Sequence, residues 1–338
     1  SRVEVVSSLL ALVIAIALCF LGLGVYSLIL QTLIYSILSA FGFYYFSPWR
    51  PKLSLNLSKL RSIFSFTRNL VFFNFINYFS RNTDQIVIGR YFNSNLLGQY
   101  SLAYRLMLFP VQNITFVLTR SLFPVLSRLQ NEDEQSFTAY LKILKIIAIV
   151  TPPLMLGLST VSDVFVNIFF GEQWSYVSTI IIWLAPVGIM QSMVSTTGSV
   201  FMARGKSNVL LWISIYNAIV QILAFVIGAN FSLIVMLKLY LLANFLMFIP
   251  NMFLAVRMLS GNFVEFLSVI LRPVICAIAM AFIVSIFKKY ISFRWEFVSL
   301  FSYICLGFVS YALILSFFER KLFIVFLTRL KFIFRAKR

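Results

Sequence analysis

Polar and ionisable side chains recur at helical spacing inside two otherwise apolar stretches of this sequence. In the first stretch, Thr67, Asn74 and Arg81 follow one another at intervals of seven, and Asn77 and Asp84 lie close to the same stripe. Residues at this spacing share one face of an α-helix, which has about 3.6 residues per turn. Such a face could bind a polar ligand, with Asp84 as a counter-charge or a cation ligand. A salt bridge between Arg81 and Asp84 at i, i+3 is an equal alternative.

The second stretch repeats this pattern. Arg105, Gln112 and Thr119 lie within roughly 40° of one another on a helix, and Asn113 and Arg120 lie about 60 to 80° from Arg105. An ionisable side chain near the bilayer centre costs about 2.5 to 3.5 kcal/mol on insertion scales, so these faces are expected to line a hydrated interior. For the amides and Thr119, hydrogen bonding between helices is an equal alternative.

The arginines indicate an anionic ligand. Asp84 is the one carboxylate close in sequence to Arg105 and Arg120, so positive charge is in surplus at these faces. A guanidinium binds a pyrophosphate or a uronic acid through two parallel hydrogen bonds. We therefore predict that Arg105 and Arg120 bind an anionic group.

The composition excludes most kinds of metal site and catalytic site. The 338 residues are 61% hydrophobic and 11% charged, and none is a histidine. Without histidine, the usual zinc ligand, the usual neutral-pH proton shuttle and every Ser-His or Cys-His catalytic pair are missing. The cysteines Cys19, Cys276 and Cys305 lie in apolar runs, where a small buried hydrophobe is the expected role. We expect no metal site, no cofactor and no enzymatic activity.

Membrane-spanning helices must position the polar stripes. A bilayer core of about 30 Å needs roughly 20 helical residues, and a search at this length finds about ten apolar spans. The sequence therefore predicts an all-α, polytopic helical membrane protein. The predicted spans are 4–21, 25–46, 63–88, 97–127, 141–160, 176–202, 209–229, 232–256, 266–287 and 296–318. The connections are short, and Asp163 is expected in one of the outer loops.

Basic residues predict the orientation, since cytoplasmic loops retain Lys and Arg. Assigning the connections to alternate sides places both ends of the chain in the cytoplasm. Lys288, Lys289 and Arg294 then fall on the outer side and violate the rule. The net charge of +18 comes mostly from the cytoplasmic connections and the basic tail. We therefore expect contact with anionic lipid and no binding of nucleic acid.

Several motifs resemble those of Wzx-type polysaccharide flippases. The run NTDQIVIGRYF at 82–92, followed by LGQYSLAYR at 97–105, resembles the family's N-x-D-x-x-I-I-G-R and L-G-x-Y-x-x-A pattern. The prolines and basic positions that the family shows next are matched by Pro110, Phe123, Pro124, Ser127 and Arg128. Shorter matches are GLGVY at 22–26, WRP at 49–51, GEQW at 171–174 and ARGK at 203–206.

The resemblance implies a fold and a domain organisation. It places the chain in the superfamily of MATE-type multidrug exporters and lipid II flippases, whose helices form two pseudo-symmetric bundles around a central cavity. In the longer members, four further helices would precede Ser1. The implied parts are the last two helices of the first bundle at 1–46, a cytoplasmic linker at 47–62, the second six-helix bundle at 63–256, two appended helices at 257–318 and a basic cytoplasmic tail at 319–338.

The resemblance also implies a transport function. The implied substrate is an undecaprenyl-pyrophosphate-linked oligosaccharide, flipped by alternating access across the bacterial inner membrane for O-antigen or exopolysaccharide biosynthesis. The residues expected to bind it are Arg105 and Arg120, Arg81 and Arg90 toward the outer mouth, and Asn74, Asn77, Gln112 and Asn113. Asp84 is the expected coupling or counter-ion carboxylate. The implied partners are the lipid bilayer, a coupling cation and other membrane proteins of polysaccharide assembly.

Two other classes of protein remain open at this point. A MATE-like, cation-coupled exporter of small molecules needs acidic cavity residues, for which Asp84 is the one good candidate. A membrane polysaccharide polymerase or glycosyltransferase needs a catalytic carboxylate or histidine, usually with a sizeable outer loop. The sequence offers no histidine and no such loop.

Overall fold

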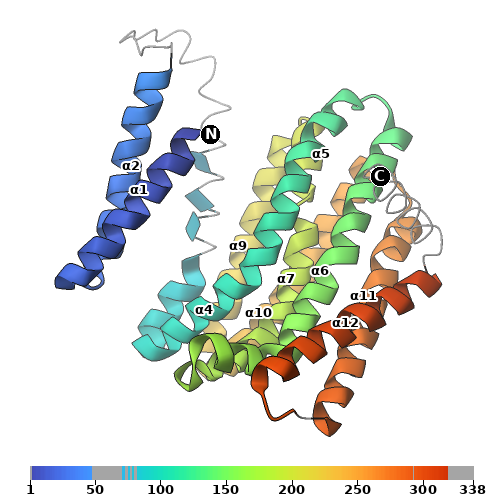
Figure 1. The fold of residues 1–338 in the computed structure, drawn as a ribbon. Helices are drawn as coiled ribbons and strands as arrows, with labels where there is room; N and C mark the ends of the chain where they lie inside the picture. The colour runs from blue at the N-terminus through green and yellow to red at the C-terminus, as the bar shows by residue number, and fades with distance from the viewer. Residues whose placement is uncertain are drawn as a thin grey trace, which may run out of the picture. The chain divides into compact units, whose positions relative to one another are not determined.

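The computed structural model describes residues 2–47, 71–72, 75–76, 78–79, 82–291 and 293–318. Every regular element in these ranges is helical, which confirms the predicted all-α class. The chain divides into two compact units, Ser1–Ser65 and Phe66–Arg338 (Figure 1). Within the described ranges, nine helices are long and apolar enough to span a membrane, and they correspond to nine of the predicted spans. Of the remaining prediction, 63–88, about half lies outside the described residues.

The described part of the first unit, residues 2–47, is a helical hairpin. It consists of α1 (Arg2–Leu18), the π-helical turn η1 (Cys19–Leu23) and α2 (Tyr26–Phe46). Gly22 and Gly24 make the reversal with φ angles of 87° and 49°, a region that glycine enters easily because it has no Cβ. The two helices approach closely at Gly42, where an added Cβ would lie 2.5 Å from Cγ1 of Val3. Most side chains of the hairpin are apolar and exposed, as expected of a surface that faces lipid.

The second unit holds the remaining described helices. After a helical segment at 82–91, its elements are α4 (Ser94–Pro110), η2 (Val111–Thr115), α5 (Phe116–Arg128), α6 (Asp133–Phe170), η3 (Glu172–Trp174), α7 (Tyr176–Val194), α8 (Thr197–Ala203), α9 (Ser207–Ala229), α10 (Leu233–Met258), α11 (Phe263–Tyr290) and α12 (Glu296–Phe318).

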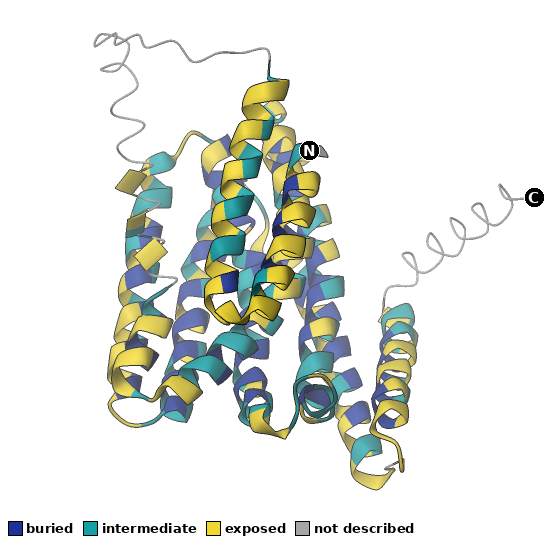
Figure 2. Cartoon of the chain, turned by 60° about the vertical axis from the view of Figure 1, so that its left-hand side comes forward, coloured by how far each residue is buried: buried dark blue, intermediate teal, exposed yellow. Residues whose placement is uncertain are grey.

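Helix α7 lies at the centre of the second unit, where it packs against α4, α6 and α10. Its apolar residues are distributed around the whole helix, as expected of a helix enclosed by others. Gly188 allows a close approach to α4, since an added Cβ would lie 2.9 Å from Cγ of Met107. The surrounding helices alternate between buried and exposed residues along their length (Figure 2).

Helix α6 extends well beyond the predicted span of 141–160. Its 38 residues are longer than a bilayer core requires. At a rise of 1.5 Å, such a helix is about 57 Å long, against a core of about 30 Å. Charged residues near its ends therefore lie on turns that continue past the core. The prediction of a loop at Asp163 is wrong, because this residue lies near the end of α6.

Prolines leave carbonyl groups without a helical partner, and tyrosines from neighbouring helices satisfy two of them. Pro153 has no N–H to donate to the carbonyl of Ile149, and the Tyr311 hydroxyl of α12 donates to that oxygen at 2.7 Å. The Tyr216 hydroxyl of α9 likewise donates, at 3.3 Å, to the carbonyl four residues before Pro250 on α10. Such replacement by a neighbouring helix is what makes proline tolerable in a membrane-spanning helix.

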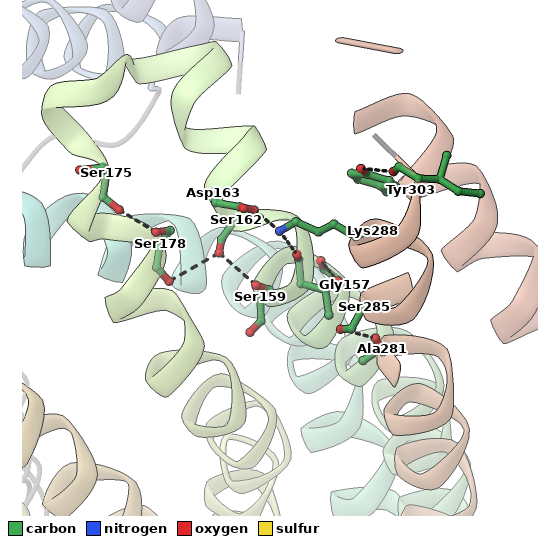
Figure 3. Close-up of polar contacts among 12 residues, drawn as sticks. Gly157, Ser159, Ser162, Asp163, Ser175, Ser178, Ala281, Ser285, Lys288 and Tyr303 are labelled. Carbon is green, nitrogen blue, oxygen red and sulfur yellow. Dashed lines mark hydrogen bonds and ion pairs between the residues drawn. The ribbon is translucent and has the colours of Figure 1, made fainter. Parts of the chain in front are cut away.

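Helices α11 and α12 pack together and against α6. Lys288, near the end of α11, forms an ion pair with Asp163 and donates a hydrogen bond to the carbonyl of Thr160 at 3.1 Å (Figure 3). The ion pair gives a physical reason for Lys288, one of the three basic residues that violate the predicted distribution of positive charge. The carboxylate of Asp163 compensates the charge of Lys288, so this lysine joins α11 to α6.

Candidate functional site

The predicted site residues fall into two groups. Asn74, Asn77 and Arg81 lie outside the described residues, and so does the proposed salt bridge of Arg81. The other six predicted residues are described: Asp84, Arg90, Arg105, Gln112, Asn113 and Arg120.

The predicted span 97–127 is a continuous helical run, α4–η2–α5, with a π-helical turn in its middle. The turn begins directly after Pro110 and contains Gln112 and Asn113. Both side chains are exposed, and Nδ2 of Asn113 donates to the carbonyl of Phe109 at 2.7 Å. Single π-helical turns occur frequently at functional sites of helical proteins. The turn thus presents two polar amides in the middle of this helical run.

Thr119, the third member of the predicted stripe, has a different role. Its hydroxyl donates to the carbonyl of Thr115 at 2.7 Å, and the Thr115 hydroxyl in turn bonds to the carbonyl of Val111. These bonds satisfy backbone oxygens around the π-helical turn. The two threonines therefore have their hydroxyls already engaged with the local backbone.

The arginines of this surface are exposed. Arg90 lies near the end of the 82–91 segment, Arg105 on α4 and Arg120 on α5. The Arg120 guanidinium lies 4.0 Å above the ring of Phe116. Within the part of the chain that the structure describes, none of the three forms an ion pair with a carboxylate. Their charge is therefore available to an anionic ligand.

Asp84 lies apart from these arginines, in the interior of the second unit. Its side chain is 1% exposed, and its Oδ2 accepts a hydrogen bond from the Tyr100 hydroxyl at 2.7 Å. Tyr100 belongs to the buried face of α4. Arg105, five residues further on, is about 140° from it around the helix axis. The carboxylate consequently contacts the inner face of α4, whereas Arg105 lies on its exposed side.

A second buried polar cluster, which the sequence analysis missed, joins α7 to α10. Nε2 of Gln191 donates to the Tyr240 hydroxyl at 2.8 Å and lies 3.3 Å from Oδ1 of Asn244. Tyr240 and Asn244 are separated by one helical turn in an apolar run, and this i, i+4 spacing of two polar side chains is the signal that could have indicated the cluster. The cluster is internally hydrogen-bonded, so its evident role is to hold these two helices together.

Three connections on one side of the second unit meet at Asp133, the first residue of α6. Arg204, in the turn between α8 and α9, forms an ion pair with Asp133 and donates to the carbonyl of Gln130. The Ser260 hydroxyl, from the turn between α10 and α11, donates to Oδ2 of Asp133 at 2.7 Å. We call Asp133, Arg204 and Ser260 the loop clasp. It joins three helical hairpins through one carboxylate.

No metal centre is evident among the described residues, since no three His, Cys, Asp or Glu side chains gather there. The arrangement offers hydrogen-bond donors and positive charge, which suit binding. It presents no nucleophile paired with a base on the α4–η2–α5 surface.

Comparison with known proteins places the chain among membrane proteins of polysaccharide assembly. Residues 1–179 match the family model described as polysaccharide biosynthesis protein. The chain is 29% identical over 256 residues to the teichuronic acid biosynthesis protein TuaB of Bacillus subtilis (strain 168), covering 75% of this chain and 53% of TuaB. It is 29% identical over 192 residues to the lipopolysaccharide biosynthesis protein WzxC of Escherichia coli (strain K12), covering 57% of this chain and 39% of WzxC. It is 25% identical over 282 residues to the succinoglycan biosynthesis transport protein ExoT of Rhizobium meliloti (strain 1021), covering 83% of this chain and 57% of ExoT.

A solved structure shares the fold. The lipid II flippase MurJ, in an inward closed conformation, superposes with a TM-score of 0.69 and 18% identity, covering 95% of this chain and 68% of that chain. This chain spans about half the length of the curated relatives described above. The matches confirm the family resemblance indicated by the sequence motifs.

Proposed function

The chain belongs to the polysaccharide biosynthesis protein family, and on that premise we propose that the whole protein flips a lipid-linked oligosaccharide across the bacterial inner membrane. The proposed substrate is an undecaprenyl-pyrophosphate-linked oligosaccharide, moved from the cytoplasmic to the outer leaflet for surface polysaccharide biosynthesis. The relatives TuaB, WzxC and ExoT are named for teichuronic acid, lipopolysaccharide and succinoglycan, and MurJ is named for lipid II. These are glycan products and a lipid-linked precursor, which supports the proposed substrate class.

The single observation that carries the proposal is the exposed polar surface of α4–η2–α5. Arg105, Gln112, Asn113 and Arg120 lie on one membrane-crossing helical run of 35 residues, with their side chains exposed. Exposed arginines are costly against acyl chains, so a hydrated cavity and an anionic ligand are the environment that suits them. The pyrophosphate of a lipid carrier supplies such an anion, which Arg binds bidentately.

The spacing of these residues favours successive contacts along a path. Arg105 and Arg120 are fifteen residues apart, which is about 22 Å along a helix and too far for both to bind one pyrophosphate at once. If the run is centred in the bilayer, about 11 Å of helix extends past each face of the core. The two arginines then lie near opposite edges of the core, and Gln112 and Asn113 lie near its middle. The head group would pass from Arg120 to the amides and then to Arg105 and Arg90.

We further propose the two-bundle organisation that the resemblance implies, with alternating access as the mechanism. Helices α1 and α2 would end the first bundle, residues 63–256 would form the second, and α11 with α12 would be appended to it. The separation of the chain near Ser65 and the packing of α11 and α12 on α6 support this division. The linker at 47–62 and both ends of the chain would lie in the cytoplasm.

Asp84 is the proposed coupling carboxylate. A buried carboxylate in a membrane protein is expensive and is usually a functional group. Its proton or a bound cation could exchange when the contact with Tyr100 opens. The same observation favours a second candidate function, a MATE-like exporter of small cations, in which Asp84 would bind the cargo or the coupling ion.

A transport assay with the purified, reconstituted protein tests the proposal. The full-length protein is reconstituted with a fluorescent undecaprenyl-pyrophosphate oligosaccharide, and arrival in the far leaflet is read with an impermeant quencher. Arg105→Ala and Arg120→Ala should each slow arrival by at least about tenfold, because a charge-assisted hydrogen bond to phosphate contributes about 1.5 to 3 kcal/mol. Arg257→Ala, an exposed arginine in the last turn of α10, is the matched control and should leave the rate unchanged. Normal flipping by both arginine variants, with loss of cation efflux in Asp84→Asn, would replace this proposal by the exporter.

A further inference from the structure

An apolar groove crosses the second unit at a place unrelated to the α4–η2–α5 surface. Its more buried lining residues, which we call the floor, are Leu156 of α6 and Ile189 and Met190 of α7. Leu242 and Phe245 of α10 form one wall, and residues of α11 form the other. The groove has a volume of about 540 Å³, within the range of about 300 to 1,000 Å³ that small-molecule sites occupy.

The groove opens on the side of α7 that faces away from α4. Met190 lines the groove, whereas Gly188 of the same helix faces Met107 of α4. Two residues along a helix are about 160° apart around its axis, so the groove and α4 lie on opposite sides of α7. Leu242 and Phe245 remain half exposed. The groove is therefore open to its surroundings and separate from the proposed substrate path.

One positive charge lies at the end of this groove. Lys238 is the single charged residue of the lining, and its Nζ lies 5.3 Å above the ring of Trp183 on α7. Among the described residues it forms no ion pair. The groove continues from Lys238 along α10 for about two turns, to Phe245.

The depth of Lys238 matches that of a lipid head group. It lies five residues, or about 7.5 Å, from the start of α10. The 26 residues of α10 exceed the core by about 4.5 Å at each end, so Lys238 lies about 3 Å inside the core. A lysine at that depth extends its ammonium to the interface, where tryptophan is also enriched. The negative groups available there are lipid phosphates.

We propose that this groove binds an anionic glycerophospholipid of the bilayer, with one acyl chain along the groove and the phosphate on Lys238. The apolar floor and walls recognise the chain, and the ammonium selects the anionic head group. The bound lipid would cover the junction of α10 and α11, two helices that barely touch each other and meet over α6 and α7.

Native mass spectrometry of the purified full-length protein tests this site, with phosphatidylglycerol, phosphatidylcholine and undecaprenyl phosphate as probes. The first phosphatidylglycerol should bind about fivefold more tightly than phosphatidylcholine, the preference expected for one basic group near an anionic lipid. Lys238→Gln should abolish that preference, and Lys238→Arg should keep it. Lys142→Gln, an exposed lysine of α6 outside the groove, is the matched control and should keep it too.

A second variant tests the apolar part of the site without changing the charge. Leu242→Trp narrows the groove and should weaken the binding of both glycerophospholipids, so it decides the question even if Lys238→Gln does not remain folded. Equal losses in Lys238→Gln and Lys142→Gln would indicate general charge attraction and would overturn the assignment. Displacement of bound phosphatidylglycerol by equimolar undecaprenyl phosphate would also overturn it, because the groove would then take the carrier lipid.

Discussion

The Tyr311 hydroxyl of α12 replaces a backbone N–H that Pro153 cannot supply to the carbonyl of Ile149. Tyr311→Phe removes only this hydroxyl and keeps the ring in place. The carbonyl then has no partner in a nearly anhydrous environment. Leaving a buried polar group unsatisfied costs about 1 to 3 kcal/mol in soluble proteins, whereas hydrogen bonds between membrane helices average about 0.6 kcal/mol. We expect the free energy of unfolding to fall by about 1 kcal/mol.

The assay is reversible unfolding of the purified protein in mixed micelles, followed by circular dichroism. Tyr290→Phe, an exposed tyrosine at the end of α11, is the control and should change the free energy of unfolding by less than about 0.5 kcal/mol. A double-mutant cycle isolates the proposed cause. Pro153→Ala restores the missing N–H, so Tyr311→Phe should cost less than half as much in that background. An equal cost in both backgrounds would refute the idea that Tyr311 compensates for the proline.

Three further changes probe other parts of the second unit. Gly228→Ala should destabilise the α9–α10 hairpin by about 1 to 3 kcal/mol in the same unfolding assay, because the added Cβ would lie 2.4 Å from Cα of Met236; unchanged stability would mean that the hairpin can open at no cost. Arg204→Gln should weaken the loop clasp at Asp133 and so speed amide hydrogen exchange in the turns that the clasp joins. Unchanged exchange rates would show that the clasp does not stabilise these turns. Asp84→Asn should abolish coupled transport while flipped substrate still equilibrates between leaflets, and full coupling in this variant would exclude Asp84 as the coupling group.

The position of Asp84 connects the proposed substrate path with the interior of the second unit. The helix that carries it also carries Arg90, which is exposed, whereas Asp84 faces Tyr100 on α4. A movement of this helix relative to α4 would change both the contact of the carboxylate and the position of the arginine. This is the physical link by which protonation or cation binding at Asp84 would alter access to the arginines.

The amino-acid sequence alone determined the class of protein and the limits of its chemistry. Long apolar runs are sufficient to predict membrane helices, because only a helix satisfies every backbone group within lipid. The absence of histidine and the surplus of arginine followed from composition, and the motifs around Asp84 and Gly98 identified the family. Each of these properties is local, so neighbouring residues in the chain decide it.

Only the tertiary structure decided which polar groups meet. Helical spacing put Asp84 near Arg81 and the other arginines, yet its described side-chain partner is Tyr100, sixteen residues away on another helix. Lys288 contacts Asp163 across more than a hundred residues, and Tyr311 satisfies a carbonyl of α6 from α12. Such pairs depend on how the helices pack. Because the hydrophobic effect is non-directional, the sequence of one helix does not specify which neighbouring helix its apolar surface contacts. The order of the helices along the chain can therefore be predicted from the sequence, whereas the contacts between helices depend on the shape complementarity of their whole surfaces.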